Sequence, residues 1–113
     1  LDRVAAYAPK VLVPGRGDAL VGTQKVGDAI AGTRAFLAAL YDTAQASVAR
    51  NLDLKATMKA TRAVMDKPFG DYAIYEHCLP FNVSRAFDEA RGIDHPVVWT
   101  DVRDREMWAA LQG

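Results

Sequence analysis

The sequence predicts a mainly α-helical protein with one or two short strands. Over most of the 113 residues, apolar side chains recur at spacings of three and four, as on the buried face of a helix. Strand character is concentrated in one run of apolar, mostly β-branched residues, Val11 to Val13. Because so short a strand needs a larger sheet, we expect the chain to be a fragment of a longer protein that supplies most of that sheet.

The N-terminal region, residues 1–24, predicts a helix, a strand and a loop in that order. Residues 1–8 predict the last turns of a helix that Pro9 ends, and its apolar side carries Leu1, Val4, Ala5 and Ala8. Residues 10–13 predict the strand, and residues 14–24 predict the loop that leads into the next helix. Many α/β enzymes use this order to place a functional group at the carboxyl edge of a sheet.

The C-terminal region, residues 25–113, predicts a helical subdomain within the same structural unit. The strongest helical pattern begins near residue 23 and ends near residue 50. Asp53 is then a suitable N-cap for a second helix that ends before Pro68, and residues 66–71 predict a turn. The side chains expected to be buried are Val26, Ile30, Thr33, Leu37, Leu40, Tyr41, Ala44 and Val48 on the first helix and Leu54, Met58 and Val64 on the second.

Further helices complete this region. A proline is best tolerated in a first helical turn, so we expect a short helix before Pro80 and another from Pro80 to Arg91 that Gly92 closes. Pro96 to Trp99 is expected to be extended, and Thr100 to cap a last helix. The apolar side chains expected in the core are Tyr72, Tyr75, Leu79, Val83, Phe87, Ala90, Trp99, Val102, Trp108 and Leu111.

Composition and charge exclude several classes of partner. The 14 basic and 14 acidic side chains cancel, so no net field recruits nucleic acid or an anionic membrane. The apolar runs are far shorter than the ~20 residues that a bilayer span needs. The lone Cys78 excludes an intrachain disulfide, which is compatible with a reducing compartment, and we expect a cytoplasmic protein.

The turn Pro14-Gly15-Arg16-Gly17 is the strongest functional candidate. Gly15 and Gly17 permit positive φ and the close approach of a ligand to the backbone. Arg16 adds a bidentate donor for an anion or an anionic substrate. The alternative is a strand-to-helix turn with an exposed arginine. A phosphate loop is excluded, because the Gly-Lys-Ser/Thr that ends such loops is absent.

His77 is a second and weaker catalytic candidate. It lies between Glu76 and Cys78, a combination compatible with proton transfer or thiolate chemistry. Adjacent helical residues point about 100° apart and rarely share a ligand. The alternative is a partly buried structural histidine beside a buried, inert cysteine. Two histidines and one cysteine, without the spacing of metal ligands, predict no metal and no cofactor bound by this chain alone.

The segment Val11–Asp18 resembles the late motif of the metallo-β-lactamase-fold hydrolases, in which a strand ends in Pro-Gly-His-Gly. The order of helix, strand, loop and long helix is similar to the C-terminal part of that αββα sandwich. In many bacterial members further helices follow, and Asp71–Glu89 is similar to such a helical extension. The family's His-x-His-x-Asp-His signature, which supplies most of its metal ligands, would lie upstream of Leu1.

The resemblance implies a metal-dependent hydrolase, with zinc or another divalent metal in the full-length parent. Arg16 stands where the family has its last metal-binding histidine, and a guanidinium has no lone pair to give. The fragment is then expected to shape the active-site edge, to be inactive alone, and to partner the N-terminal part of the parent and further copies of itself. The alternative function is a non-enzymatic helical interaction or oligomerisation module.

Overall fold

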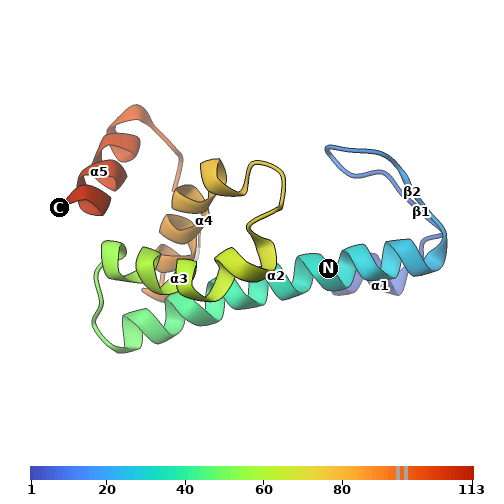
Figure 1. Cartoon of the computed structure of the whole chain (residues 1–113), viewed down its shortest axis with the longest axis horizontal. Helices are drawn as coiled ribbons and strands as arrows, with labels where there is room; N and C mark the ends of the chain where they lie inside the picture. The colour runs from blue at the N-terminus through green and yellow to red at the C-terminus, as the bar shows by residue number, and fades with distance from the viewer. Residues whose placement is uncertain (94, 96) are drawn as a thin grey trace. The chain divides into compact units, whose positions relative to one another are not determined.

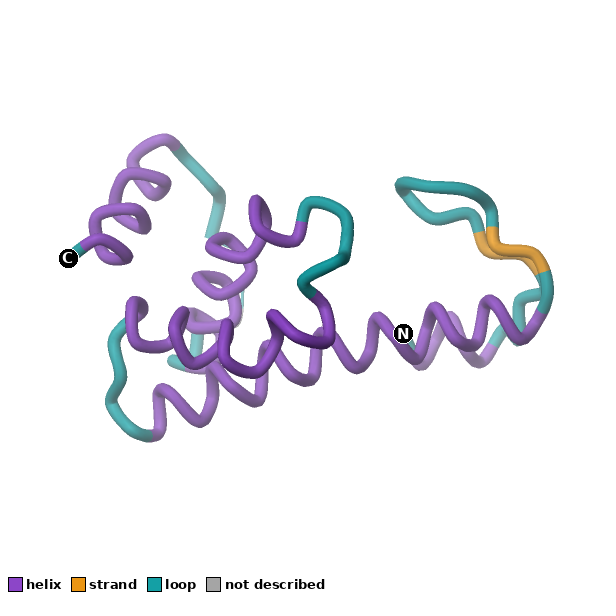
Figure 2. The backbone as a smooth tube through the Cα atoms, viewed as in Figure 1, coloured by secondary structure: helices purple, strands orange, loops and turns teal. Residues whose placement is uncertain are grey.

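The computed structural model describes residues 1–93, 95 and 97–113 and is mainly helical, with one two-stranded antiparallel sheet (Figures 1 and 2). The expected class, mainly α with short strands, is confirmed. The chain forms two compact units, Leu1–Leu37 and Ala38–Gly113. The elements in chain order are α1 (Asp2–Ala6), β1 (Val11–Leu12), β2 (Leu20–Val21), α2 (Thr23–Ala49), α3 (Leu54–Phe69), α4 (Tyr75–Ala90) and α5 (Asp101–Gln112).

The first unit holds α1, the β1–β2 hairpin and the N-terminal part of α2. In the hairpin, Val11 pairs with Val21 and Leu12 pairs with Leu20. The strand β2 lies inside the segment that was expected to be a loop. A two-residue strand has no periodicity to detect, and only its pairing with β1 identifies it.

Burial in this first unit is slight. Val26 is 1% exposed, but Leu1 and Val4 on α1 are 41% and 39% exposed. The expected apolar side of the first helix is therefore open to solvent. An exposed ion pair also links α1 to α2 in this unit, and in it Arg34 lies 2.6 Å from Asp2.

The second unit has the larger core. Both α4 and α5 pack on α3 (Figure 1). The predicted caps are confirmed: the Asp53 carboxylate accepts the Ala56 N–H at 2.8 Å, and the Thr100 hydroxyl accepts the Arg103 N–H at 3.2 Å. The buried apolar side chains of this unit are Leu40, Ala44, Met65, Phe69, Tyr75, Leu79, Val83, Ala86 and Met107.

Two prolines lie inside helices, which corrects the predicted breaks. Pro68 lies in the last turn of α3, so the turn expected at residues 66–71 begins only at Gly70. Pro80 lies within one continuous α4 instead of between two helices. A proline removes one helical hydrogen bond, and here burial of Phe69 beside Pro68, and of Pro80 itself, offsets that loss.

The buried face of α3 differs from the predicted one. Val64 is 50% exposed, whereas Met65 is fully buried. Two threonines, Thr57 and Thr61, share the buried face. Thr57 donates to the Asp53 carbonyl at 2.8 Å, and Thr61 donates to the Thr57 carbonyl at 2.9 Å. A hydroxyl that is satisfied within its own helix can be buried at little cost, so threonines take positions that an apolar pattern does not reveal.

Corrections of the same kind apply to α2 and α5. Ser47 is buried at 2% exposure, whereas Leu37 is 48% and Tyr41 36% exposed, and Thr33 is exposed as well. On α5 only Met107 is buried. The predicted core residues that are instead well exposed are Tyr72, Trp99, Val102 and Trp108.

The segment between α4 and α5 begins as predicted. Gly92 adopts φ +94°, and the Ile93 N–H donates to the Asp88 carbonyl at 3.0 Å, which closes α4. Of the stretch expected to be extended, Pro96 lies outside the described residues, and residues 97–99 form neither helix nor strand. Over the part of the chain that the structure describes, no helix is long and apolar enough to cross a membrane.

Candidate functional site

The hairpin turn between β1 and β2 carries the Pro-Gly-Arg-Gly motif (Figure 2). At the end of the hairpin away from the turn, the Gly22 N–H donates to the Lys10 carbonyl at 2.8 Å. Gly17 adopts φ +86°, a left-handed conformation that side chains disfavour. A Cβ at Gly15 or Gly17 would meet no atom within 4 Å, so this backbone is open to an approaching group.

Arg16 is exposed on this turn. Within residues 1–93, 95 and 97–113 its guanidinium has neither a hydrogen bond nor an ion pair. All of its donors are therefore available to a group from outside the described chain. A guanidinium donates a bidentate pair to carboxylates, phosphates or an oxyanion, and it cannot bind a metal as a neutral ligand.

The second candidate, His77, lies on α4 and is exposed. Its ring centroid is 5.9 Å from that of Phe81. Cys78 is half-buried. The expectation of a partly buried histidine beside a buried cysteine is therefore wrong for His77. Arg16 belongs to the first unit and His77 to the second.

The described residues do not fit a metal centre. Among them, no group of three or more His, Cys, Asp or Glu side chains is close enough to hold an ion. Arg16 adds no lone pair to such a set.

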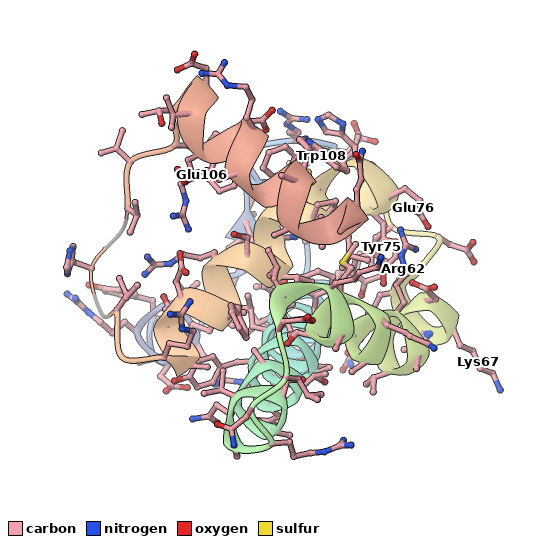
Figure 3. The ribbon with its side chains drawn as sticks, turned by 90° about the vertical axis from the view of Figure 1, so that its left-hand side faces the viewer. Arg62, Lys67, Tyr75, Glu76, Glu106 and Trp108 are labelled. Carbon is pink, nitrogen blue, oxygen red and sulfur yellow. The ribbon has the colours of Figure 1, made fainter. Side chains whose placement is uncertain are left out.

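A polar cluster that the sequence did not reveal joins α3 to α4. Arg62 donates to both carboxylate oxygens of Glu76, at 2.9 and 2.6 Å, and lies 3.5 Å from Asp66. The Tyr75 hydroxyl donates to Asp66 at 2.8 Å. Figure 3 shows Arg62, Tyr75 and Glu76 together, whereas Lys67 extends away from them. The one signal in the sequence was the i,i+4 spacing of Arg62 and Asp66.

The electrostatics of this cluster fit a structural brace. The hydrogen bond from Arg62 lowers the pKa of Glu76. Burial raises the pKa of the Tyr75 phenol, and its hydrogen bond to Asp66 raises that pKa further. Both shifts favour the protonation states that the hydrogen bonds already use. The cluster thus holds α4 on α3, and its tyrosine is a poor candidate for a proton donor or nucleophile at neutral pH.

No protein-family model matches this chain, and no curated protein matches it significantly. The resemblance to the metallo-β-lactamase-fold hydrolases therefore stays a prediction.

Proposed function

We propose that this chain is the C-terminal portion of a metallo-β-lactamase-like, metal-dependent hydrolase, in which the β1–β2 turn shapes one edge of the active site. The observation that carries the proposal is the exposed Arg16, which has no partner in the described part of the chain and stands between two glycines. An arginine held on a turn with accessible backbone is suited to bind an anionic substrate or the oxyanion formed on attack.

The surface of the hairpin supports the same proposal. Val11, Val13 and Val21 are 52%, 77% and 63% exposed. Val11 and Val21 form a cross-strand pair, so one side of the hairpin presents β-branched side chains to solvent. A two-stranded hairpin is marginal alone, and an apolar face on it fits a place within a larger sheet. In the proposal the N-terminal part of the parent protein supplies that sheet.

The division of labour follows from the residues present. Zinc or another divalent metal in the parent would activate water for attack on an ester, thioester or amide carbonyl, and its ligands would come from the N-terminal part. Arg16 would donate to the substrate or to the developing oxyanion. The chain alone is then expected to be inactive.

A second candidate function is a non-enzymatic interaction module. Leu37 and Tyr41 lie four residues apart on α2 and are 48% and 36% exposed. This spacing places them on one face of the helix. Pairing of α2 with a second copy would cover them without any chemistry. This candidate leaves the unpartnered Arg16 and its glycine-rich turn without a role.

The experiment that separates the two candidates uses the full-length gene product. Its coding sequence upstream of Leu1 is read for a His-x-His-x-Asp-His run, and the purified protein is assayed on ester, thioester and amide substrates before and after chelation. We expect the signature and a chelator-sensitive hydrolase activity. An upstream sequence without the signature, together with no hydrolysis, would favour the interaction module.

A further inference from the structure

A cavity of about 320 Å³ lies in the second unit, lined by α4, α5 and the segment that precedes α5. Its volume is at the lower end of the range for small-molecule pockets. All of its lining residues belong to the second unit, and none belongs to the hairpin turn on which the proposed function rests. The side chains that carry the argument are Phe81, Asn82, Arg85, Asp88, Trp99 and Arg103.

Two aromatic rings form one side of this cavity in a fixed arrangement. The ring centroids of Phe81 and Trp99 are 5.0 Å apart at an interplanar angle of 68°, an edge-to-face contact. The guanidinium carbon of Arg103 lies 5.2 Å from the centre of the Trp99 ring. Trp99 is nevertheless 38% exposed, so part of its surface is free to meet a planar ligand.

Two arginines on the cavity wall are held in place by neighbours. Arg103 pairs with Asp88, which is 8% exposed. Arg85 lies 2.5 Å from a Glu89 oxygen and donates to the His95 carbonyl at 3.0 Å. Because a guanidinium carries five N–H donors, each arginine keeps donors beyond those contacts.

Polar groups without partners also lie at this cavity. The Arg103 Nε–H is buried and has no hydrogen-bond acceptor among the described residues. The Asn82 carboxamide likewise has no partner in residues 1–93, 95 and 97–113. Buried donors in folded proteins almost always have acceptors, so the Arg103 Nε–H indicates an acceptor oxygen from outside the described residues. The half-buried Asn82 carboxamide is free to bond to a ligand or to solvent.

We propose that this cavity binds a small aromatic monocarboxylate. The ring would pack against Trp99 and Phe81, and the carboxylate would accept from Arg85 and Asn82. Asp88 and Glu89 each pair with one of the two arginines, so these four side chains carry no net charge together. Such a wall disfavours a phosphate dianion more than a single carboxylate, which would be held by hydrogen bonds and not by net charge. The ligand thus combines a planar ring with one carboxylate.

The test uses benzoate as the probe and the full chain. The two tryptophan indole N–H signals are separated in a two-dimensional NMR spectrum and assigned with Trp108→Phe. Trp108 lies outside the cavity lining and is 41% exposed, so it serves as an internal control. We expect benzoate to shift the Trp99 signal saturably and to leave the Trp108 signal in place.

Two related compounds test the two halves of the ligand. Benzyl alcohol keeps the ring without the charge, and acetate keeps the carboxylate without the ring. Both are expected to bind more weakly than benzoate. Equal affinity for benzyl alcohol would overturn the role of the carboxylate, and the absence of a saturable Trp99 shift with benzoate would overturn the site.

Variants then assign the carboxylate contact. Arg85→Gln is expected to weaken benzoate binding by about tenfold or more, the scale of a lost charge-assisted hydrogen bond. The matched control is Arg105→Gln, since Arg105 is exposed and pairs with Asp101 away from the lining. Asn82→Ala provides a second variant if Arg85→Gln unfolds. Unchanged affinity in the folded variants would contradict the assignment.

Discussion

Neighbouring residues on α3 give the sharpest test of how the second unit is packed. Met65 is fully buried, whereas Val64 is 50% exposed. Removing a fully buried methionine side chain costs about 2–5 kcal/mol, because apolar contacts are lost and a cavity is left. We therefore expect Met65→Ala to lower the free energy of unfolding by about 3 kcal/mol.

The adjacent Val64→Ala is the matched control. Truncating a half-exposed valine forfeits roughly 1 kcal/mol of burial, and alanine's higher helix propensity returns up to about 0.6 kcal/mol. The net change is expected to lie within about 0.5 kcal/mol. The expected losses of unfolding free energy therefore differ severalfold, although the two substituted residues are neighbours in the sequence.

Thermal unfolding followed by circular dichroism at the helix band provides the assay. For a unit of roughly 60–100 residues, each 1 kcal/mol shifts Tm by about 4–8 °C. Met65→Ala should therefore unfold roughly 12–24 °C below the parent chain, and Val64→Ala close to it. Equal losses for the two variants, or a larger loss for Val64→Ala, would refute the assigned register of the α3 face.

Three further predictions concern assembly, metal and alkaline pH. The exposed hairpin valines and the α2 residues Leu37 and Tyr41 should make the chain at least dimeric at micromolar concentration, and sedimentation showing a stable monomer would contradict this. Metal analysis of tag-free protein should find well under one equivalent of zinc, iron or manganese, and stoichiometric metal bound through His77 and Cys78 would overturn that expectation. Because the folded pKa of Tyr75 lies above its ordinary value of 10.0, its stabilising contribution is complete below pH 10 and is lost as pH rises further. Tyr75→Phe should flatten this alkaline loss of stability, with Tyr41→Phe as the control, and an unchanged pH profile would exclude Tyr75 as its source.

Helix positions and caps could be read from the sequence, because local side chains determine them. The Asp53 and Thr100 caps and the long α2 helix depend on neighbours within a few residues. The interruptions expected at Pro68 and Pro80 were wrong, because packing of Phe69 and Pro80 decided the outcome. Tertiary burial outweighed a local helix breaker at both places.

Long-range contacts could not be read in the same way. Pairing of Val11 with Val21 joins residues across a loop, and the bond from Arg62 to Glu76 joins two helices. Neither contact leaves a periodic pattern in the sequence from which it could be predicted. Buried threonines such as Thr57 satisfy their hydroxyls within the helix, so an apolar pattern passes over them. The sequence predicted the glycine-rich turn of the candidate site. It did not predict the polar cluster between α3 and α4 or the cavity beside Trp99.

The proposed role of Arg16 is tested most directly by the turnover of the full-length protein. Arg16→Ala should lower turnover by ~10²-fold or more, the scale for losing one oxyanion donor. Stability should barely change, because Arg16 is exposed on a turn. Arg50→Ala, which removes another exposed arginine, should leave turnover unchanged. If Arg16→Ala leaves both turnover and substrate affinity at the level of the Arg50→Ala control, then Arg16 is a solvated turn residue and the proposed active-site edge is contradicted.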